Sequence, residues 1–247
     1  MINFAVRSET GFVRKNNEDN FYANGIFMSE QERDNPFFIT GSTDAPCIFA
    51  VCDGMGGEEC GELASLMTVK TLDEHAEKIR IGFYKEVDDF AQNANRNLLS
   101  LPVRSATTLA LVVIKESNKF MAYNLGDSRI YRFENDRLLR ITNDHTVAED
   151  KVRMGLLTPK KAEQSSERHI LTAYVGNRDY TSPDFYGPYN SSKIILCSDG
   201  LTDMLSYQEI STIVKNSESA SETVNKLVDE ALSKGGHDNV TCVVITF

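Results

Sequence analysis

The stretch CIFAVCDGMGG at residues 47–57 runs from an apolar segment into an aspartate and a glycine-rich turn. Its apolar residues are typical of a buried strand, and Asp53 and Gly54 follow where that strand ends. A similar order recurs at residues 193–200, where the apolar run KIILC is followed by Ser198, Asp199 and Gly200. An apolar segment that is followed by an aspartate and a glycine therefore occurs twice in this chain.

The remaining apolar patterns predict further strands and helices. Strands are expected at 47–52, 106–114, 119–125, 129–133, 193–197 and 239–247. The turns at 117–119 and 126–128 are too short for crossover helices, which favours antiparallel pairing. One-sided apolar repeats predict helices at about 58–79, 83–98 and 224–232. Capping-box spacing at 206–209 and 219–222 marks helix starts, and the polar stretch 24–43 is interpreted as a hairpin or loop.

This order of elements indicates an α+β fold, a central antiparallel β-sandwich with helices on both outer faces in four layers, αββα. A doubly wound parallel sheet would need helices between successive strands. The 247 residues contain 41% hydrophobic and 25% charged residues, which is typical of globular proteins. They show no repeat, low-complexity tract or linker, so a single domain over 1–247 is expected.

Charge and targeting signals exclude several classes of protein. The chain has 26 Lys and Arg against 36 Asp and Glu, a net charge of −10, which argues against nucleic acid as a partner. No apolar stretch is long enough to span a membrane, and the first residues lack a secretory signal, so a cytoplasmic protein is expected. The 5 cysteines form no C-x-x-C pair and are interpreted as buried hydrophobes, with a redox role as the alternative.

Four aspartates lie where an apolar strand meets a glycine-containing turn: Asp53, Asp127, Asp199 and Asp238. Each alone is also typical of an ordinary turn, which is the structural alternative. If these ends converge, several carboxylates share a small volume, and hard oxygen ligands of this kind suit Mg²⁺ or Mn²⁺. The acidic pair Glu18 and Asp19 adds to the set, and Arg14, a few residues earlier, could bind a phosphate beside the metal site.

These segments together resemble the metal-dependent protein phosphatases of the serine/threonine type 2C class, in their compact bacterial form. The resemblance covers nearly the whole chain in the order of the family. It rests on residues 11–19 (GFVRKNNED), 51–57 (VCDGMGG), 105–109 (SATTL), 124–129 (NLGDSR), 141–146 (ITNDHT), 171–176 (LTAYVG), 196–203 (LCSDGLTD) and 236–241 (GHDNVT).

The resemblance implies a role for each matching position. Asp53 would bridge two Mn²⁺ or Mg²⁺ ions, and the Gly54 carbonyl would ligate one of them. Arg14 would bind the substrate phosphate, and Asn239 would support the ligands around Asp238. The implied metal-binding residues are Glu18, Asp19, Asp53, Gly54, Asp127, Asp199 and Asp238, of which Asp127 and Asp199 match the positions of a third, weaker ion.

The implied reaction is hydrolysis of phosphoserine and phosphothreonine on proteins, by direct attack of a water or hydroxide that bridges the metals. Residues of about 145–171 correspond to the family's flap, and a serine/threonine kinase is the expected counterpart. A monomer is the simplest expectation. Two alternatives stay open at this stage: a family member that binds phosphoproteins without cleaving them, and a different two-metal hydrolase such as a nuclease.

Two positions depart from the family pattern. Met55 stands where some eukaryotic members carry a histidine proposed as the general acid, and a thioether donates no proton. His237 lies beside Asp238, but a lone histidine in a glycine-rich turn is more typically structural or solvent-facing. Ala173 replaces an arginine usual in the family, which bears on the flap or on substrate docking. Neither departure affects an implied metal position, so activity is expected.

Overall fold

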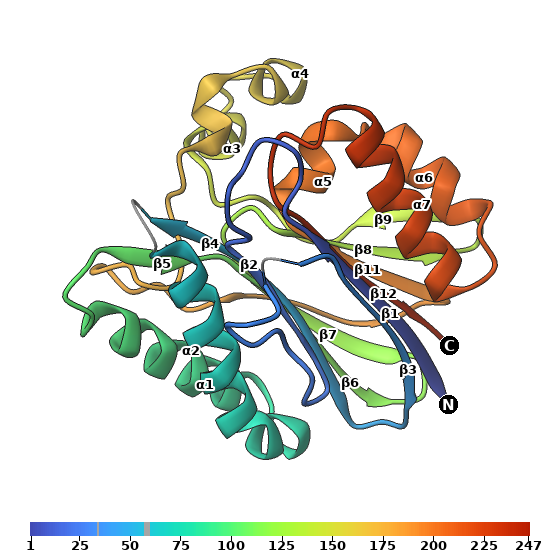
Figure 1. Ribbon diagram of the computed structural model, residues 1–247, viewed down its shortest axis with the longest axis horizontal. Helices are drawn as coiled ribbons and strands as arrows, with labels where there is room; N and C mark the ends of the chain where they lie inside the picture. Colours follow the sequence, from blue (N-terminus) through green and yellow to red (C-terminus); the bar gives the residue numbers. More distant parts are fainter. Residues whose placement is uncertain (34, 57–59) are drawn as a thin grey trace.

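Two antiparallel sheets pack face to face and helices cover both outer faces in the computed structural model, which describes residues 1–33, 35–56 and 60–247 (Figure 1). The four-layer α+β sandwich expected from the sequence is confirmed. In the described part of the chain, no helix combines the length and the apolar character that crossing a membrane requires.

The first sheet has the strand order β3-β1-β12-β11-β8-β9. Its strands are β1 (Ile2–Glu9), β3 (Phe37–Thr43), β8 (Arg129–Glu134), β9 (Arg137–Arg140), β11 (Lys193–Cys197) and β12 (Val240–Thr246). Strands β1 and β12 bring the two ends of the chain together at the centre of this sheet. The second sheet has the order β10-β7-β6-β4-β2, with β5 paired to the end of β4. Its strands are β2 (Asp19–Ala23), β4 (Cys47–Gly56), β5 (Ser105–Thr107), β6 (Leu109–Glu116), β7 (Lys119–Leu125) and β10 (Asp184–Asn190).

Each outer face is covered by its own helices. The second sheet is covered by α1 (Gly61–Ile81) and α2 (Tyr84–Leu99). The first sheet is covered by α5 (Asp199–Met204), α6 (Tyr207–Lys215) and α7 (Ala220–Ser233). Above one end of both sheets lie α3 (Val147–Arg153), α4 (Pro159–Glu163) and a short 3₁₀ turn (Ser166–His169), all within the predicted 145–171 segment (Figure 1).

The hydrophobic core consequently forms three layers. One cluster lies between the sheets and includes Phe49 and Val243, and the other two lie between each sheet and its helices. Strands β4, β6 and β11 are buried on both faces, so the continuous apolar run of each strand contributes to two layers of the hydrophobic core. All the cysteines are buried, as expected for small hydrophobes.

Both predicted helix starts are found, but only one of them has a complete capping box. The Ser206 hydroxyl accepts a hydrogen bond from the Glu209 amide while the Glu209 carboxylate accepts from the Ser206 amide, which is a complete capping box. The Ser219 hydroxyl accepts from the Glu222 amide, but the Glu222 carboxylate accepts from the Glu218 amide, so this box is not reciprocal.

Several elements differ from the sequence prediction. The stretch 24–43 is not only loop, because its last residues form edge strand β3 paired with β1. Strands β1, β2, β9 and β10 were not expected. The predicted start of the first helix at residue 58 lies outside the described residues, and the described helix α1 begins at Gly61.

Candidate metal centre

The pairing of β2 with β4 places Asp19 directly opposite Asp53. Asp19 is 1% exposed, whereas Asp53 keeps partial exposure at the end of its strand. The Ser198 hydroxyl donates to Asp19 Oδ2 over 2.7 Å, while Asp19 Oδ1 is buried without a hydrogen-bond partner in the described residues. A buried carboxylate oxygen in that state calls for a cation or a proton.

Asp199 is the first residue of α5 and follows Ser198, which contacts Asp19. The side chains of Asp199 and Asp53 are within hydrogen-bonding reach of each other. Burial, followed by the charges of Asp19 and Asp199, raises the pKa of Asp53 well above its usual range. Burial and the neighbouring charge of Asp203 raise the pKa of Asp199 to about 6. These carboxyl groups therefore repel one another strongly when all are ionised.

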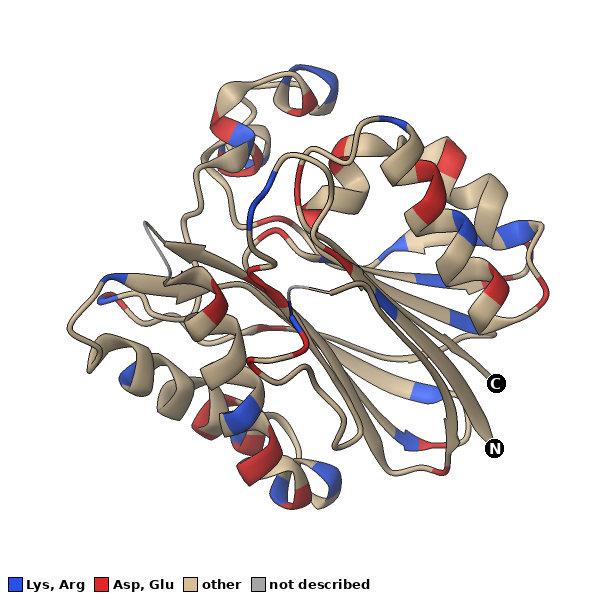
Figure 2. Ribbon diagram, in the orientation of Figure 1, with Lys and Arg blue, Asp and Glu red and all other residues tan. Residues whose placement is uncertain are grey.

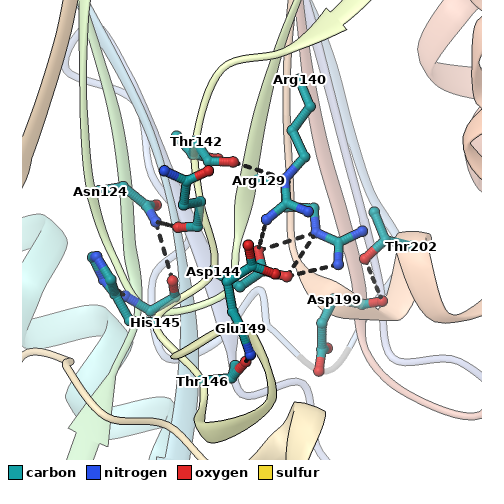
Figure 3. Close-up of polar contacts among 12 residues, drawn as sticks. Asn124, Arg129, Arg140, Thr142, Asp144, His145, Thr146, Glu149, Asp199 and Thr202 are labelled. Atoms are coloured by element: carbon teal, nitrogen blue, oxygen red, sulfur yellow. Dashed lines mark hydrogen bonds and ion pairs between the residues drawn. The ribbon is translucent and has the colours of Figure 1, made fainter. Parts of the chain in front are cut away.

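Asp127 reaches the same group of acids from the turn between β7 and β8. Its turn begins at Gly126, whose φ of 106° is a backbone conformation that favours glycine. Burial, followed by the charge of Asp199, raises the pKa of the Asp127 carboxyl well above normal. Behind it, Asp144 is held between Arg129 and Arg140 at 2.7 Å and 2.6 Å, so both arginines face the carboxylate of Asp144 (Figure 3).

Glycine is required where β4 meets the start of α1. The Gly54 amide donates to the Glu18 carbonyl over 3.0 Å, and a Cβ on Gly54 would lie 2.0 Å from the carbonyl oxygen of Gly61. A Cβ on Gly61 would lie 2.6 Å from the carboxyl carbon of Glu18. The absence of side chains at both positions lets the Glu18 carboxylate lie against the beginning of α1. Burial, and then the charge of Glu62, raises the pKa of Glu18.

Asp238, Asn239 and Arg14 meet beside this group. Arg14 Nη2 donates to Asp238 Oδ2 over 2.6 Å, and the Asn239 amide donates to Asp238 Oδ1 over 2.8 Å. The Asn239 side chain accepts from the Glu18 amide and donates to the carbonyls of Thr10 and Asn16, which fixes the loop that carries Arg14 and Glu18. Arg14 itself is 52% exposed and open to solvent.

Strand register, hydrogen bonds and mutual charge effects thus place all the acids that the sequence analysis singled out in one group. Acidic positions gather near the middle of the view in Figure 2, between the two sets of helices. Within residues 1–33, 35–56 and 60–247, neither Asp19, Asp53 nor Asp199 forms an ion pair with a Lys, Arg or His side chain. Enclosed carboxylates with an unpartnered oxygen and no cationic side chain match the donor set of hard divalent cations such as Mn²⁺ or Mg²⁺. The residues present therefore fit a metal centre.

Two residues that the sequence analysis did not single out also face this centre. His169 and Asp203 offer ligand atoms that, together with one from Asp199, all lie within 4.8 Å of one another. Asp203 lies four residues after Asp199 on the same helix, and this i, i+4 spacing was a usable signal in the sequence. His169 gave no signal, because only the fold of the 145–171 segment brings it near α5.

A cavity of about 620 Å³ separates the 145–171 segment from α5 and α6 and opens onto Asp127 and Asp199. Arg168 spans it with an ion pair of 2.8 Å to Asp203. The predicted flap segment is therefore adjacent to the acids and tied to the helix that begins with one of them.

The raised pKa values predict that the stability of the metal-free protein falls as pH rises from 5 to 8. The pKa of Asp19 is raised to about 7 and that of Asp199 to about 6, so the folded state binds protons that the unfolded state has released. In EDTA, we expect the thermal midpoint to fall by at least about 4 °C over this range, and excess Mn²⁺ to remove most of the fall.

Differential scanning fluorimetry across this pH range measures the effect. Asp19→Asn removes one of the titrating groups, so its midpoint should depend less on pH in EDTA. A midpoint that is constant or rises with pH in EDTA would contradict the electrostatic description of the site.

This chain is similar over most of its length to proteins of a known family. The pattern of the family described as protein phosphatase 2C matches residues 29–235. A serine/threonine phosphatase, stp, of Listeria innocua is 30% identical over 252 residues, which cover 97% of this chain and 93% of that protein.

Solved structures of similar proteins cover the whole chain. The serine/threonine phosphatase PstP/Ppp of Mycobacterium tuberculosis is 27% identical, with a TM-score of 0.82 and coverage of 100% of this chain and 99% of that one. The catalytic domain of PstP in complex with two manganese ions is 26% identical, with a TM-score of 0.80 and the same coverage.

Proposed function

Because this chain belongs to the protein phosphatase 2C family and is a serine/threonine protein phosphatase of that family, we propose that its enclosed carboxylates hold two Mn²⁺ or Mg²⁺ ions at the site of hydrolysis. The observation that carries this proposal is the Asp19–Asp53–Asp199 group, which is enclosed without a cationic partner in the described residues. The proposed ligands are Glu18, Asp19, Asp53, Gly54, Asp127, Asp199 and Asp238, with Asp127 and Asp199 also available to a third, weaker ion.

Ions held in this way lower the pKa of a water molecule and offset negative charge on phosphoryl oxygens. The residues of the chain supply the arrangement. Asp53 lies opposite Asp19 and within hydrogen-bonding reach of Asp199, so it is the proposed shared ligand. Ser198 holds one oxygen of Asp19 and leaves the other oxygen for a ligand. Thr108 and Thr107 hydrogen-bond the backbone of Asp53 on both sides over 2.9 Å, which fixes the position of its carboxylate.

Arg14 is the proposed phosphate-binding residue. Its guanidinium is half exposed, lies beside Asp238 and has donors left over for an incoming phosphoryl group. A charge-assisted pair of hydrogen bonds from arginine orients the phosphate and offsets charge that grows on its oxygens. The hydrogen bond from Arg14 to Asp238 holds this arm at the edge of the site.

The serine or threonine oxygen of the substrate gains a proton as its bond to phosphorus breaks, and no histidine stands at position 55 to supply it. Met55 follows Gly54 and is no proton donor. His237 is exposed and makes no hydrogen bond to another described residue, which supports its interpretation as a solvent-facing residue of the turn. Water is therefore the proposed source of this proton.

The partners follow from the reaction. The substrates are phosphorylated proteins, and a serine/threonine kinase that produces them is the proposed counterpart. We further propose that the chain acts as a monomer, since the described residues of the site all come from one chain, and that it acts in the cytoplasm. The two alternatives from the sequence analysis, a binding-only protein and a different two-metal hydrolase, make different predictions in the assay below.

Hydrolysis of phosphothreonine should require a divalent cation. With 2 mM Mn²⁺, the protein is expected to cleave p-nitrophenyl phosphate and a phosphothreonine peptide, and excess EDTA should lower both rates at least about 100-fold. The release of inorganic phosphate measures the reaction. Cleavage of an oligonucleotide in preference to the phosphopeptide would favour the different hydrolase. Binding of the phosphopeptide without turnover would favour the binding-only protein, and full activity in EDTA would exclude the metal mechanism.

A further inference from the structure

A second cavity, of about 580 Å³, lies away from the 145–171 segment, between the end of α2, residues 101–105 and residues 174–179. In Figure 1, α2 and β5 lie at the left of the molecule, whereas α3 and α4 lie at the top. Nothing in the proposed mechanism uses this cavity.

The cavity is bounded by two antiparallel segments. Thr107 and Val175 exchange both backbone hydrogen bonds, at 3.0 Å and 2.9 Å. A Cβ on Gly176 would lie 2.7 Å from the Ser105 carbonyl, so the two segments stay in close contact beyond this pair. Arg104 lies three residues before Thr107, and Arg178 lies three residues after Val175. Both arginines therefore lie just beyond this pair, and both line the cavity.

These two arginines carry charge that the protein does not neutralise. Both are exposed, both line the cavity, and neither forms an ion pair or hydrogen bond with any described residue. The chain has a net charge of −10, so acids are abundant elsewhere, yet Asp179 is the only acid among the described residues that line this cavity. The arrangement favours an anion from outside.

The two arginines do not serve to cap the C-terminal end of α2. Its last carbonyls already accept hydrogen bonds from the chain itself: the Ser100 amide donates to the carbonyls of Arg96 and Asn97, and the Leu101 amide donates to that of Leu98. The Ser100 hydroxyl also donates to the carbonyl of Asn97. Arginine side chains are therefore not needed to cap this helix.

Two apolar side chains of the lining are well exposed, and one polar group of the lining is unused. Leu99 and Val103 are each 43% exposed, which is high for large hydrophobic side chains. The hydroxyl of Ser105 is buried and has no hydrogen-bond partner in the described residues. A ligand that fits this surface combines a negative charge with an adjoining apolar group.

The cavity is connected directly to the metal centre. β5 begins at Ser105 in the cavity and pairs with the end of β4, and the Thr107 hydroxyl donates to the Asp53 carbonyl over 2.9 Å. Three residues of extended strand span roughly 10 Å, which a bound substrate chain would cover with a similar number of residues.

We propose that this cavity, bounded by Arg104 and Arg178, is a docking site for the phosphoprotein substrate, and that it takes an acidic residue with an apolar neighbour three to five positions from the phosphorylated residue. Carboxylate recognition by the arginines would set which sites are cleaved efficiently, and the apolar wall would hold the adjoining side chain. This proposal rests on the phosphatase activity of the neighbouring centre.

Peptide pairs test it. Each pair contains one phosphothreonine and differs only by Glu-Leu against Gln-Leu, placed three to five residues before or after the phosphothreonine. The Glu-Leu member of at least one pair should have a KM about 5- to 10-fold lower with the native protein. In the double variant Arg104→Gln/Arg178→Gln this preference should disappear, through a rise in KM for the Glu-Leu peptide with little change in kcat.

Two controls separate the possible outcomes. Arg137→Gln removes an exposed arginine from β9, in the other sheet, and should preserve the preference. Hydrolysis of p-nitrophenyl phosphate should be equal in all the variants, because this substrate is too small to reach the cavity. If the native protein cleaves it but does not distinguish the peptides of any pair, or if Arg137→Gln has the same effect as the double variant, the docking site is overturned. If the native protein does not cleave p-nitrophenyl phosphate, the proposed centre itself is wrong.

Discussion

Asp53→Asn is expected to lower kcat for phosphopeptide hydrolysis by about 10³-fold or more, which corresponds to ~4 kcal/mol of transition-state stabilisation. Asp53 lies opposite Asp19 and within reach of Asp199, so it is the carboxylate that both proposed ions would share. An amide of the same shape keeps the packing but loses the negative charge. Steady-state release of phosphate with saturating Mn²⁺ measures the change.

The same substitution should stabilise the protein in EDTA. Burial and the surrounding aspartates raise the pKa of Asp53 well above normal, so its ionised form is unfavourable when no cation is bound. We expect a higher thermal midpoint for Asp53→Asn in EDTA and a smaller increase on addition of Mn²⁺ than in the native protein. Asp89→Asn, on the exposed face of α2 beside Lys85, is the matched control and should change neither property. Near-native turnover by Asp53→Asn would show that the shared-ligand assignment is wrong.

Arg14→Ala should lower kcat/KM for phosphopeptides by about 10²-fold, or ~3 kcal/mol, through loss of a charge-assisted contact to the phosphoryl group. Its effect on stability should be small, because Arg14 is 52% exposed and ion pairs of that kind contribute little to folding. Inhibition by inorganic phosphate gives a second measurement, and its Ki should increase in parallel.

Arg14→Lys and Lys15→Ala make this test specific. Lysine keeps the charge but not the forked donor geometry, so Arg14→Lys should recover only part of the lost activity. Lys15 is the adjacent exposed cation and should be dispensable. If Lys15→Ala matches Arg14→Ala, the effect is general attraction of an anion, and the assignment of Arg14 as the phosphate-binding residue is excluded.

The elements that the sequence analysis missed share a physical cause. Strand β3 is an edge strand whose residues alternate between half-buried and exposed, and it contains Gly41, so it lacks a continuous apolar run. That glycine is needed because a Cβ would lie 2.5 Å from the Phe4 ring of β1. Strand β2 is short and begins with Asp19, which is an unfavourable residue in a strand. Its pairing with β4 outweighs that preference.

The candidate site was easier to predict than these strands. Asp53 and Asp199 carry a local signal, an acid beside glycine at the end of an apolar run, which needs no knowledge of distant segments. Asp19 has no such signal of its own, and its place opposite Asp53 comes from the register of β2 on β4. His169 and the Arg104–Arg178 pair depend even more on segments that are distant in sequence.

The sequence by itself determined the residue types, the apolar periods and the strand ends that carry acids, because these depend on neighbours within a few residues. From them followed the layered α+β fold and the acids of the metal centre. Only the tertiary structure decided that Arg14 bonds to Asp238. It also decided that, among the described residues, one oxygen of Asp19 has no hydrogen-bond partner and two arginines without ion pairs line one cavity beside β5. Contacts of this kind are set by strand register and layer packing between distant segments, which local patterns do not specify.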